Sequence, residues 1–269
     1  MSAATEYPVL PGAEAFSAPG AEHAEGQRAK FGLALIHGFT GSPVSMRPLG
    51  ELLAARGFRV EVPRLPGHGT HPRDMQRTRY PDWRAEVERT LQHLTAVAER
   101  VVLVGLSMGG TLVLDVASSG AHRVAGVVCI NPQLLDREGA LVKLSGLIEL
   151  VAPLAPAALA GLRKDDIAKP GVSEQAYDWV PTASGNSLLK ALPRVRAQLG
   201  SLRCPLLVAH SRQDHSVPPR NSEELLRLVP HAQELVLERS YHVATLDYDL
   251  ELLAARISDF CDAVGRANE

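Results

Sequence analysis

The amino-acid sequence predicts an α/β fold in which helices cover both faces of a mostly parallel sheet. Short apolar runs alternate along the chain with segments whose apolar residues recur every three or four positions. The runs are continuously apolar, as is typical of parallel strands that are buried on both faces. The chain has 269 residues, 45% of them hydrophobic, so residues 1–269 are expected to form one domain with a large core.

The first strand and helix signals lie close together. Residues 31–38, FGLALIHG, predict a buried strand. Ser42 and Pro43 match an N-cap followed by proline at the first helical position. They open a helix predicted over 44–56, which Gly57 ends.

A second strand and a longer helix follow. The alternating residues 58–62, FRVEV, predict a strand, and the Pro and Gly content of 63–72 predicts a loop. Pro81 opens the next helix, because apolar residues recur behind it on one face. These residues are Trp83, Val87, Leu91, Leu94 and Ala98.

The rest of the chain continues the alternation. Further strands are predicted over 101–104, 124–130, 205–210 and 233–238. A helix over 108–119 ends at Gly120, and Asn221 is expected to cap a helix over 222–229, with Glu224 at the capping-box position. The closing amphipathic helix presents Leu250, Leu253, Ile257, Phe260 and Val264.

The alternation stops over residues 133–202, which contain no convincing strand. An insertion at the carboxyl ends of the strands would cover the ligand crevice, so this interval is interpreted as a helical cap. It contains the apolar stretch 141–162, whose uncharged part, 150–162, is shorter than the ~20 residues that span a bilayer. Transient contact of the cap with a membrane surface remains open.

The composition excludes several classes of function. A formal net charge of -2 leaves no basic excess to attract nucleic acid, and 4% aromatic residues provide few stacking surfaces for single strands. There is no Gly-x-Gly-x-x-Gly and no P-loop, so no cofactor is expected. His68, His71 and Asp74 have a spacing that could suggest a metal, but no second cluster accompanies their Pro/Gly loop, so no metal is expected either.

The cysteines and the first residues bear on the compartment. The three cysteines, Cys129, Cys204 and Cys261, lie far apart and match neither a disulfide framework nor a CxxC zinc pattern. The start, MSAATEYPVLPGAEAF, lacks the basic and apolar regions of a signal peptide. We therefore expect a cytoplasmic protein. The sequence does not predict an oligomeric state.

One serine lies between glycines where a predicted strand meets a predicted helix. The sequence is VVLV, then Gly105-Leu106-Ser107-Met108-Gly109, then an apolar helix. A serine hydroxyl is a weak nucleophile that needs a base and oxyanion donors. A strained Gly-x-Ser-x-Gly turn lifts the serine oxygen above the sheet and keeps neighbouring atoms clear of it. A glycine-rich turn with a capping serine is the alternative, but the flanking strand and helix favour a nucleophile.

Two backbone N–H groups are candidates for the oxyanion hole. The amide of Met108 lies at the helix N-terminus directly after Ser107. The second candidate is the amide of Phe39, in the loop after the strand 31–38. His37 precedes the nucleophile, the wrong chain order for the base, and is interpreted as a structural histidine.

The acid and the base are expected after the last two strands. Asp214 follows the strand 205–210, and His242 follows the strand 233–238. The order Ser107, Asp214, His242 is that of a nucleophile–acid–histidine triad. His215 is expected to point elsewhere. Asp115 is interpreted as salt-bridged or solvated, and Asp247 and Asp249 as dipole-stabilising residues at the start of the last helix.

These motifs together resemble the α/β-hydrolase esterases, and more narrowly the bacterial monoacylglycerol lipases. The residues that carry the resemblance are YPVLPGAE, HGFTGSPVSMRPL, PRLPGHGTHPRDMQRT, GLSMGGTL, SRQDHSVPP and SYHVATLDYD. They extend nearly from end to end and are specific in combination, whereas GLSMGG alone is shared by many esterases. The resemblance implies the α/β-hydrolase fold.

The resemblance also implies an activity and a substrate site. It implies hydrolysis of 1(3)- and 2-monoacylglycerols to glycerol and fatty acid, with the triad and the two amides named above. It implies an apolar cap wall and a cap glutamate that contacts the glycerol hydroxyls, matched here by Glu174 in SEQAYDWVPTAS. An ordinary exposed helix carboxylate is the alternative for Glu174.

The chain departs from the family over residues 133–166, which leaves the acyl-chain preference open. Several apolar residues there could dock on lipid and line an acyl tunnel, or could simply pack on the sheet. They are Leu141, Leu144, Leu147, Ile148 and Leu150. The main alternative function is a carboxylesterase for short- to medium-chain esters with the same triad. An acyltransferase and a non-catalytic receptor or scaffold are further alternatives.

Overall fold

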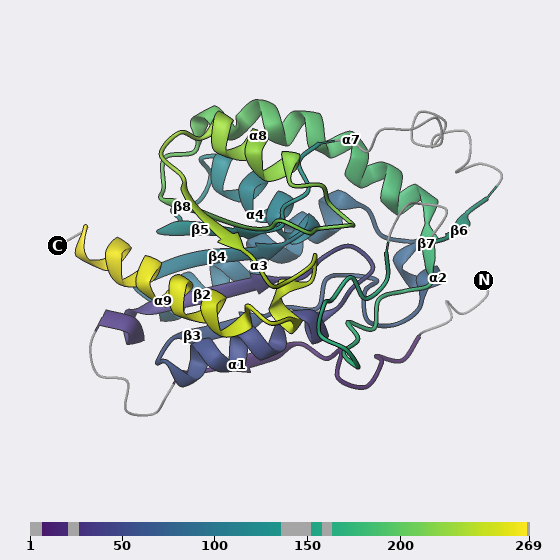
Figure 1. Cartoon of the computed structure of the whole chain (residues 1–269), viewed down its shortest axis with the longest axis horizontal. Coiled ribbons are helices and arrows are strands. Elements are labelled where there is room, and N and C mark those ends of the chain that lie inside the picture. The colour runs from purple at the N-terminus through teal and green to yellow at the C-terminus, as the bar shows by residue number, and fades with distance from the viewer. Residues whose placement is uncertain (1–6, 21–26, 136–151, 158–162, 268–269) are drawn as a thin grey trace.

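A seven-stranded sheet forms the centre of the molecule (Figure 1). The computed structural model describes residues 7–20, 27–135, 152–157 and 163–267. The strands of the sheet, in their spatial order, are β1 (Phe16–Ala18), β3 (Arg59–Val62), β2 (Phe31–Ile36), β4 (Arg100–Leu106), β5 (Gly126–Ile130), β8 (Leu206–Ser211) and β9 (Gln233–Leu237). The edge strand β1 is antiparallel to β3 and all other neighbours are parallel, so the predicted parallel sheet is confirmed.

Helices cover both faces of this sheet. In the described part of the chain, the helices are α1 (Arg47–Ala55), α2 (Pro72–Met75), α3 (Tyr80–Val97), α4 (Met108–Ser118), α7 (Thr182–Gln198), α8 (Arg220–Leu228) and α9 (Leu250–Arg266). Short 3₁₀ turns cover Gln27–Lys30, Pro43–Ser45, Leu199–Ser201 and Ala244–Leu246. Ser42 caps the turn at Pro43, and α1 begins after it.

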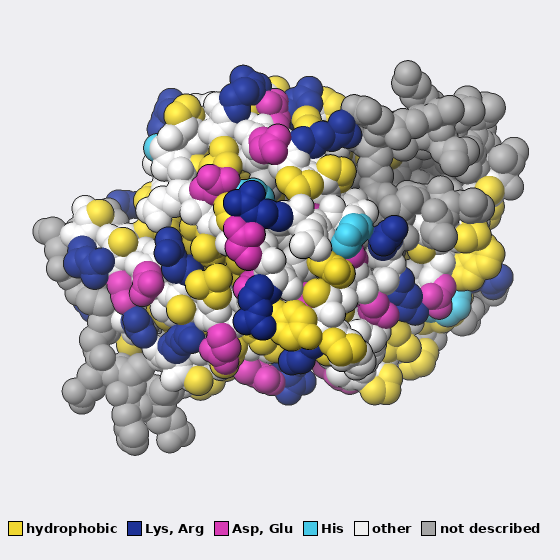
Figure 2. Space-filling model, viewed as in Figure 1, with side chains coloured by type: hydrophobic (Ala, Val, Ile, Leu, Met, Phe, Trp, Pro, Cys, Tyr) yellow, Lys and Arg dark blue, Asp and Glu magenta, His cyan; other side chains and the backbone are white. Residues whose placement is uncertain are grey.

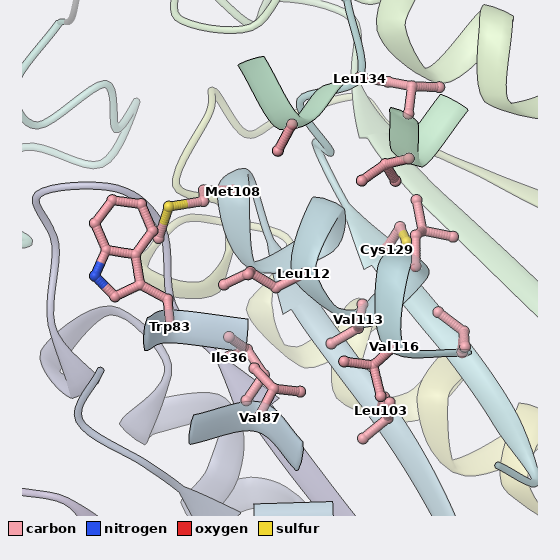
Figure 3. Packing of buried hydrophobic residues seen from close by; sticks show 14 of the residues in the cluster. Ile36, Trp83, Val87, Leu103, Met108, Leu112, Val113, Val116, Cys129 and Leu134 are labelled. Atoms are coloured by element: carbon pink, nitrogen blue, oxygen red, sulfur yellow. The ribbon is translucent and has the colours of Figure 1, made fainter. Parts of the chain in front are cut away.

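Alternate residues of the central strands β2, β4, β5 and β8 enter two separate cores. In β2, Ala34 and Ile36 pack with α3, α4, α7 and α8, whereas Leu33 and Leu35 pack with α1 and α9. Figure 3 shows part of the first core, where Leu112 and Val116 of α4 lie over strand residues such as Leu103. Burial on both faces is the reason why these central strands are almost entirely apolar, whereas the outer strand β3 alternates.

The strand order has a switch point between β2 and β4. The chain passes from β2 to β3 toward one edge, then returns to β4 on the other side of β2. The carboxyl ends of β2 and β4 therefore border the switch point, where open α/β sheets bind their ligands. The loop after β2 and Ser107 lie at these two strand ends.

The predicted cap at Asn221 is wrong. Helix α8 begins at Arg220, with Pro219 as its N-cap residue. The Asn221 side chain instead accepts the N–H groups of Leu134 and Leu135, at 2.9 and 2.8 Å. Buried N–H groups need acceptors, and this distant requirement overrides the local capping preference. Glu224, expected in a capping box, pairs with Arg227.

The segment between β5 and β8, residues 131–205, contains strands that the sequence pattern does not reveal. Strand β6 (Leu154–Pro156) pairs antiparallel with β7 (Trp179–Pro181), and α7 follows. Three-residue strands that contain proline are too short to show a period. The apolar residues 141, 144, 147, 148 and 150 lie outside the described residues. Within the described part of the chain, no helix is long and apolar enough to cross a membrane.

The surface carries charges of both signs. On the face shown in Figure 2, Lys and Arg side chains are interspersed with Asp and Glu side chains. Exposed ion pairs such as Arg47–Glu51 and Arg212–Glu238 contribute little to stability, because water screens them.

Candidate active site

Ser107 occupies the sharp turn between β4 and α4. Its backbone angles, φ 57° and ψ -119°, belong to a conformation that residues with a side chain rarely adopt. The Ser107 N–H donates to the carbonyl oxygen of Ile130 at 2.9 Å, and the Ser107 carbonyl accepts from Gln133 N–H at 3.2 Å. The surrounding chain thus holds the strained turn on both sides.

Glycines at this turn permit direct contact between backbones. A Cβ on Gly105 would lie 2.3 Å from the carbonyl carbon of Gly109, and a Cβ on Gly109 would lie 2.1 Å from the carbonyl oxygen of Ile36. Both distances are far below van der Waals contact. The close approach also sets Gly38 beside Ser107, because a Cβ on Gly38 would lie 3.3 Å from that of Ser107.

The two candidate oxyanion donors flank this contact. Met108 is the first residue of α4, and N–H groups in the first turn of a helix have no acceptor inside the helix. Phe39 directly follows Gly38 in the loop after β2. The next residue, Thr40, has a φ of 62°, and its hydroxyl donates to the Phe39 carbonyl at 2.6 Å.

Asp214 and His242 form a buried pair. His242 Nδ1 lies 2.7 Å from Asp214 Oδ2, and the two side chains are 11% and 1% exposed. The other carboxylate oxygen of Asp214 accepts the N–H groups of Ser216 and Val217, at 2.9 and 2.6 Å. Since both oxygens are engaged, the carboxylate is oriented toward the imidazole.

The surroundings of His242 favour its protonated form. Burial lowers the pKa of His242, but Asp214, Glu174 and Asp166 together outweigh burial and raise this pKa overall. His37 lacks such partners, and burial lowers its pKa to about 4. Its Nδ1 faces the Gly38 carbonyl at 2.9 Å, and its Nε2 accepts from Leu65 N–H at 3.2 Å. His37 therefore ties two loops together, as predicted for a structural histidine.

Glu174 lies beside the loop after β2. Its Oε2 would be 3.6 Å from a Cβ on Gly41. Desolvation raises the pKa of Glu174 to about 7, although part of the residue remains accessible. Its N–H donates to Asp165 Oδ1 at 2.7 Å, and Tyr177 N–H donates to the Thr40 carbonyl at 3.2 Å. The alternative of an exposed helix carboxylate is wrong, because Glu174 lies in an irregular segment before β7.

Comparison with known proteins identifies the family. Residues 33–256 match the model of the alpha/beta hydrolase family. The chain is 39% identical to a thermostable monoacylglycerol lipase of Bacillus sp. (strain H-257), over 95% of this chain and 96% of that protein. The chain belongs to the α/β-hydrolase family. The hydrolase also matches a carboxylesterase of Bacillus subtilis (strain 168), with 24% identity over 85% of this chain and 91% of the relative.

A solved structure supports the same assignment. It comes from work on LipS and LipT, two metagenome-derived lipolytic enzymes, and is 35% identical to this hydrolase. The TM-score is 0.85, and the match covers 95% of this chain and 100% of the other.

Asn131 is a site residue that sequence analysis missed. It directly follows β5 with a φ of 44°, and its Nδ2 donates to the carbonyl of His242 at 2.7 Å. Its Oδ1 accepts the N–H of Ser211 at 2.7 Å. Its neighbour Ile130, the last residue of β5, accepts the N–H of Ser107. Two adjacent residues at the end of β5 therefore hold the serine turn and the histidine loop of this hydrolase. A polar residue directly after the apolar run VVCI is the signal that could have indicated it.

Asp115, Asp247 and Asp249 have hydrogen-bond or ion-pair partners outside the proposed triad. Asp115 is fully buried and binds Tyr80, Arg84 and Arg194, so the predicted salt bridge is confirmed. Asp247 accepts four backbone N–H groups, from Ala168, Lys169, Tyr241 and Tyr248. Asp249 accepts the N–H of Arg239.

The residues of the histidine-rich loop are also engaged locally. His71 caps α2, and Asp74 accepts from the Thr70 hydroxyl at 2.8 Å. His68 is buried beside His37 and Trp83. Among the described residues, no group of three or more His, Cys, Asp or Glu side chains is arranged to hold a metal ion.

Proposed function

We propose that this hydrolase cleaves the ester bond of monoacylglycerols, releasing glycerol and a free fatty acid through an acyl-enzyme. Ser107 is the nucleophile, His242 the general base and Asp214 the acid. The observation that carries the proposal is the strained turn at Ser107 together with the buried Asp214–His242 pair. Adjacent residues at the end of β5, Ile130 and Asn131, bind the Ser107 turn and the His242 backbone. Sequence identity of 39% to a monoacylglycerol lipase supports the substrate class.

The chemistry follows from these positions. His242 Nε2 takes the proton of the Ser107 hydroxyl as the oxygen attacks the ester carbonyl. The N–H groups of Phe39 and Met108 stabilise the tetrahedral oxyanion. His242 then protonates the glycerol oxygen as it leaves, and water attacks the acyl-enzyme by the same route in reverse. Asp214 orients the Nδ1–H tautomer and stabilises the imidazolium.

Glu174 is proposed to select the alcohol part of the substrate. Its carboxyl group lies beside the loop that carries Phe39, close to where the leaving alcohol would lie. Two hydroxyl groups of glycerol can donate to its oxygens. These hydrogen bonds would replace those that the Glu174 carboxylate loses with water on burial. This loss of water is the cause of the raised pKa of Glu174.

The proposal includes the domain organisation and the setting of the enzyme. Residues 1–269 form one domain, with 133–202 as a cap over the crevice. We further propose a cytoplasmic enzyme whose cap touches lipid surfaces transiently. Trp179 of β7 supports this contact, because the residue is 48% exposed on that segment and tryptophan favours membrane interfaces.

The test is a comparison of kcat/KM for monoacylglycerols and for methyl esters of the same fatty acids. We expect a clear preference for monoacylglycerols, and no activity in Ser107→Ala. Glu174→Gln should remove most of this preference while retaining methyl ester hydrolysis. Glu223→Gln, which alters an exposed carboxylate on α8, is the control and should change neither rate.

Equal rates on both ester types would instead favour a broad carboxylesterase. The similarity to the Bacillus subtilis carboxylesterase supports that alternative. Unchanged turnover in Ser107→Ala would overturn the nucleophile assignment itself.

A further inference from the structure

The loop after β8 contains two adjacent residues that each enter an Asp–His pair. Asp214 pairs with His242, as described above. The next residue, His215, pairs with Asp166 of the β5–β8 segment. Asp166 Oδ1 lies 2.8 Å from His215 Nδ1, and Asp166 Oδ2 accepts the His215 N–H at 3.0 Å. The second pair has no place in the proposed chemistry.

Asp166 also binds the loop that carries His242. Its carbonyl oxygen accepts the N–H of Val243, the residue after His242, at 3.1 Å. On the other side of His242, the ring of Tyr241 packs edge-on against the ring of His215, with centroids 4.6 Å apart. Asp166 therefore contacts the residue that follows the proposed acid and the residue that follows the proposed base.

We propose that Asp166 is a positioning residue, which fixes the distance between the Asp214 loop and the His242 loop from the side of the β5–β8 segment. This inference rests on the proposed triad. Asn131 holds the His242 carbonyl from the strand side, and Asp166 holds the Val243 N–H from the opposite segment. The backbone that carries the imidazole of His242 is thus held from both sides.

Asp166 is a buried carboxylate whose charge acts on His242. Its side chain is 3% exposed, although that of its partner His215 is 38% exposed. Removing a carboxylate from water is costly, and an asparagine could accept the same N–H at lower cost. The carboxylates of Asp214, Glu174 and Asp166 all act on His242 and favour its protonated form.

Asp247 provides a matched control. It is also a buried aspartate, 3% exposed, and it joins the same segment to the same loop through the N–H groups of Ala168 and Tyr241. Within the described part of the chain, its carboxylate binds only N–H groups outside the Asp214 loop, and the charges that raise the pKa of His242 are those of Asp214, Glu174 and Asp166. Replacing Asp247 therefore breaks hydrogen bonds between the segment and the His242 loop, but leaves the contact of Asp166 with the Asp214 loop intact.

The experiment measures kcat, KM and the pH profile of kcat/KM on a soluble ester, with Tm as the check on folding. Asp166→Asn is expected to lower kcat by about 10- to 100-fold at little change in KM. An asparagine has one oxygen where Asp166 uses two, for the His215 N–H and for His215 Nδ1, and small misplacements of catalytic groups have effects of this size. Asp166→Asn should also move the acidic limb of the profile to lower pH. His215→Asn should lower kcat but leave that limb in place, because Asp166 keeps its charge. Asp247→Asn should lower Tm and leave the limb unchanged.

Wild-type kcat and an unmoved limb in Asp166→Asn would overturn the inference, as would the same kinetic change in Asp247→Asn. If Asp166→Asn does not fold, His215→Asn decides, and wild-type kcat in that variant overturns the inference. His242→Ala separates the two proposals. Activity in His242→Ala overturns the triad and this inference together, whereas an inactive His242→Ala beside a fully active Asp166→Asn overturns this inference alone.

Discussion

Two regions enclose the candidate site, and different forces hold them. At the carboxyl edge of the sheet, backbones touch directly through Gly105 and Gly109, and main-chain hydrogen bonds support Ser107. In residues 163–181 of the β5–β8 segment, side-chain carboxylates accept N–H groups: Asp166 accepts that of His215 from a neighbouring loop, and Asp165 accepts that of Glu174 within the segment. The first region depends on the absence of side-chain atoms, and the second depends on the presence of charge.

The difference has consequences for stability and for pH. Backbone packing at the sheet edge stabilises the fold and does not titrate. The carboxylates of the segment are partly desolvated, which raises the pKa of Glu174 to about 7. We therefore expect changes at the sheet edge to affect folding or to abolish chemistry, and changes in the segment to affect selectivity and pH dependence.

The largest expected effect comes from neutralising Asp214, the proposed catalytic acid in the loop after β8. Asp214→Asn should lower kcat by about 10⁴-fold, because an asparagine selects the wrong tautomer of His242 and cannot stabilise the imidazolium. The measurement is kcat on a nitrophenyl ester, with the circular dichroism spectrum as a control for the fold. A mild loss would break the comparison, since it would assign the acid to a carboxylate of the segment such as Asp166 or Glu174.

The second effect tests backbone contact. Gly109→Ala should destabilise the protein by about 3 kcal/mol or more, because the added methyl group collides with the Ile36 carbonyl. Gly120→Ala is the control: its φ is 71°, but no atom lies within 4 Å of the added Cβ, so a cost of about 1 kcal/mol is expected from backbone strain alone. Urea unfolding of both variants measures the difference. Equal losses would show that the turn tolerates a side chain.

The sheet edge is also the region that the sequence predicts well. Its signals are local: an apolar run, a glycine on each side of Ser107 and an apolar helix stand within 17 residues, 101–117. The chain order predicts the partnership of Asp214 and His242, which the structure brings to 2.7 Å. Such a pattern can be recognised because proteins with this fold carry their nucleophile on the same strand-to-helix turn.

The segment is predicted poorly because its contacts are distant in sequence. Asp166 binds His215, 49 residues away, and Asn221 binds Leu134, 87 residues away. No local pattern distinguishes such residues from ordinary surface polar groups. Glu174 was found only through a family resemblance, and Asn131 was missed although it follows a buried strand.

The smallest expected effect is on the free energy of unfolding, which the buried charge of Glu174 lowers at high pH. The pKa of Glu174 rises from the ordinary 4.5 to about 7 on folding, so the folded state binds more protons than the unfolded state between these values. The contribution of Glu174 to stability is therefore most favourable below pH 4.5 and is lost as the pH rises toward 7. A neutral glutamine avoids this loss, and Glu174→Gln should be more stable than the wild type at pH 8 but not at pH 5.

After allowance for solvent screening, the gain at pH 8 should be about 1 kcal/mol, or roughly 2–4 °C in Tm. Differential scanning calorimetry at the two pH values measures it, and Glu223→Gln on α8 should show no such rise. A Tm that falls equally at both pH values would mean that Glu174 stabilises the fold like the backbone contacts of the sheet edge. A rise confined to pH 8, together with loss of the glycerol preference, would show that the segment keeps a destabilising charge because the substrate requires it.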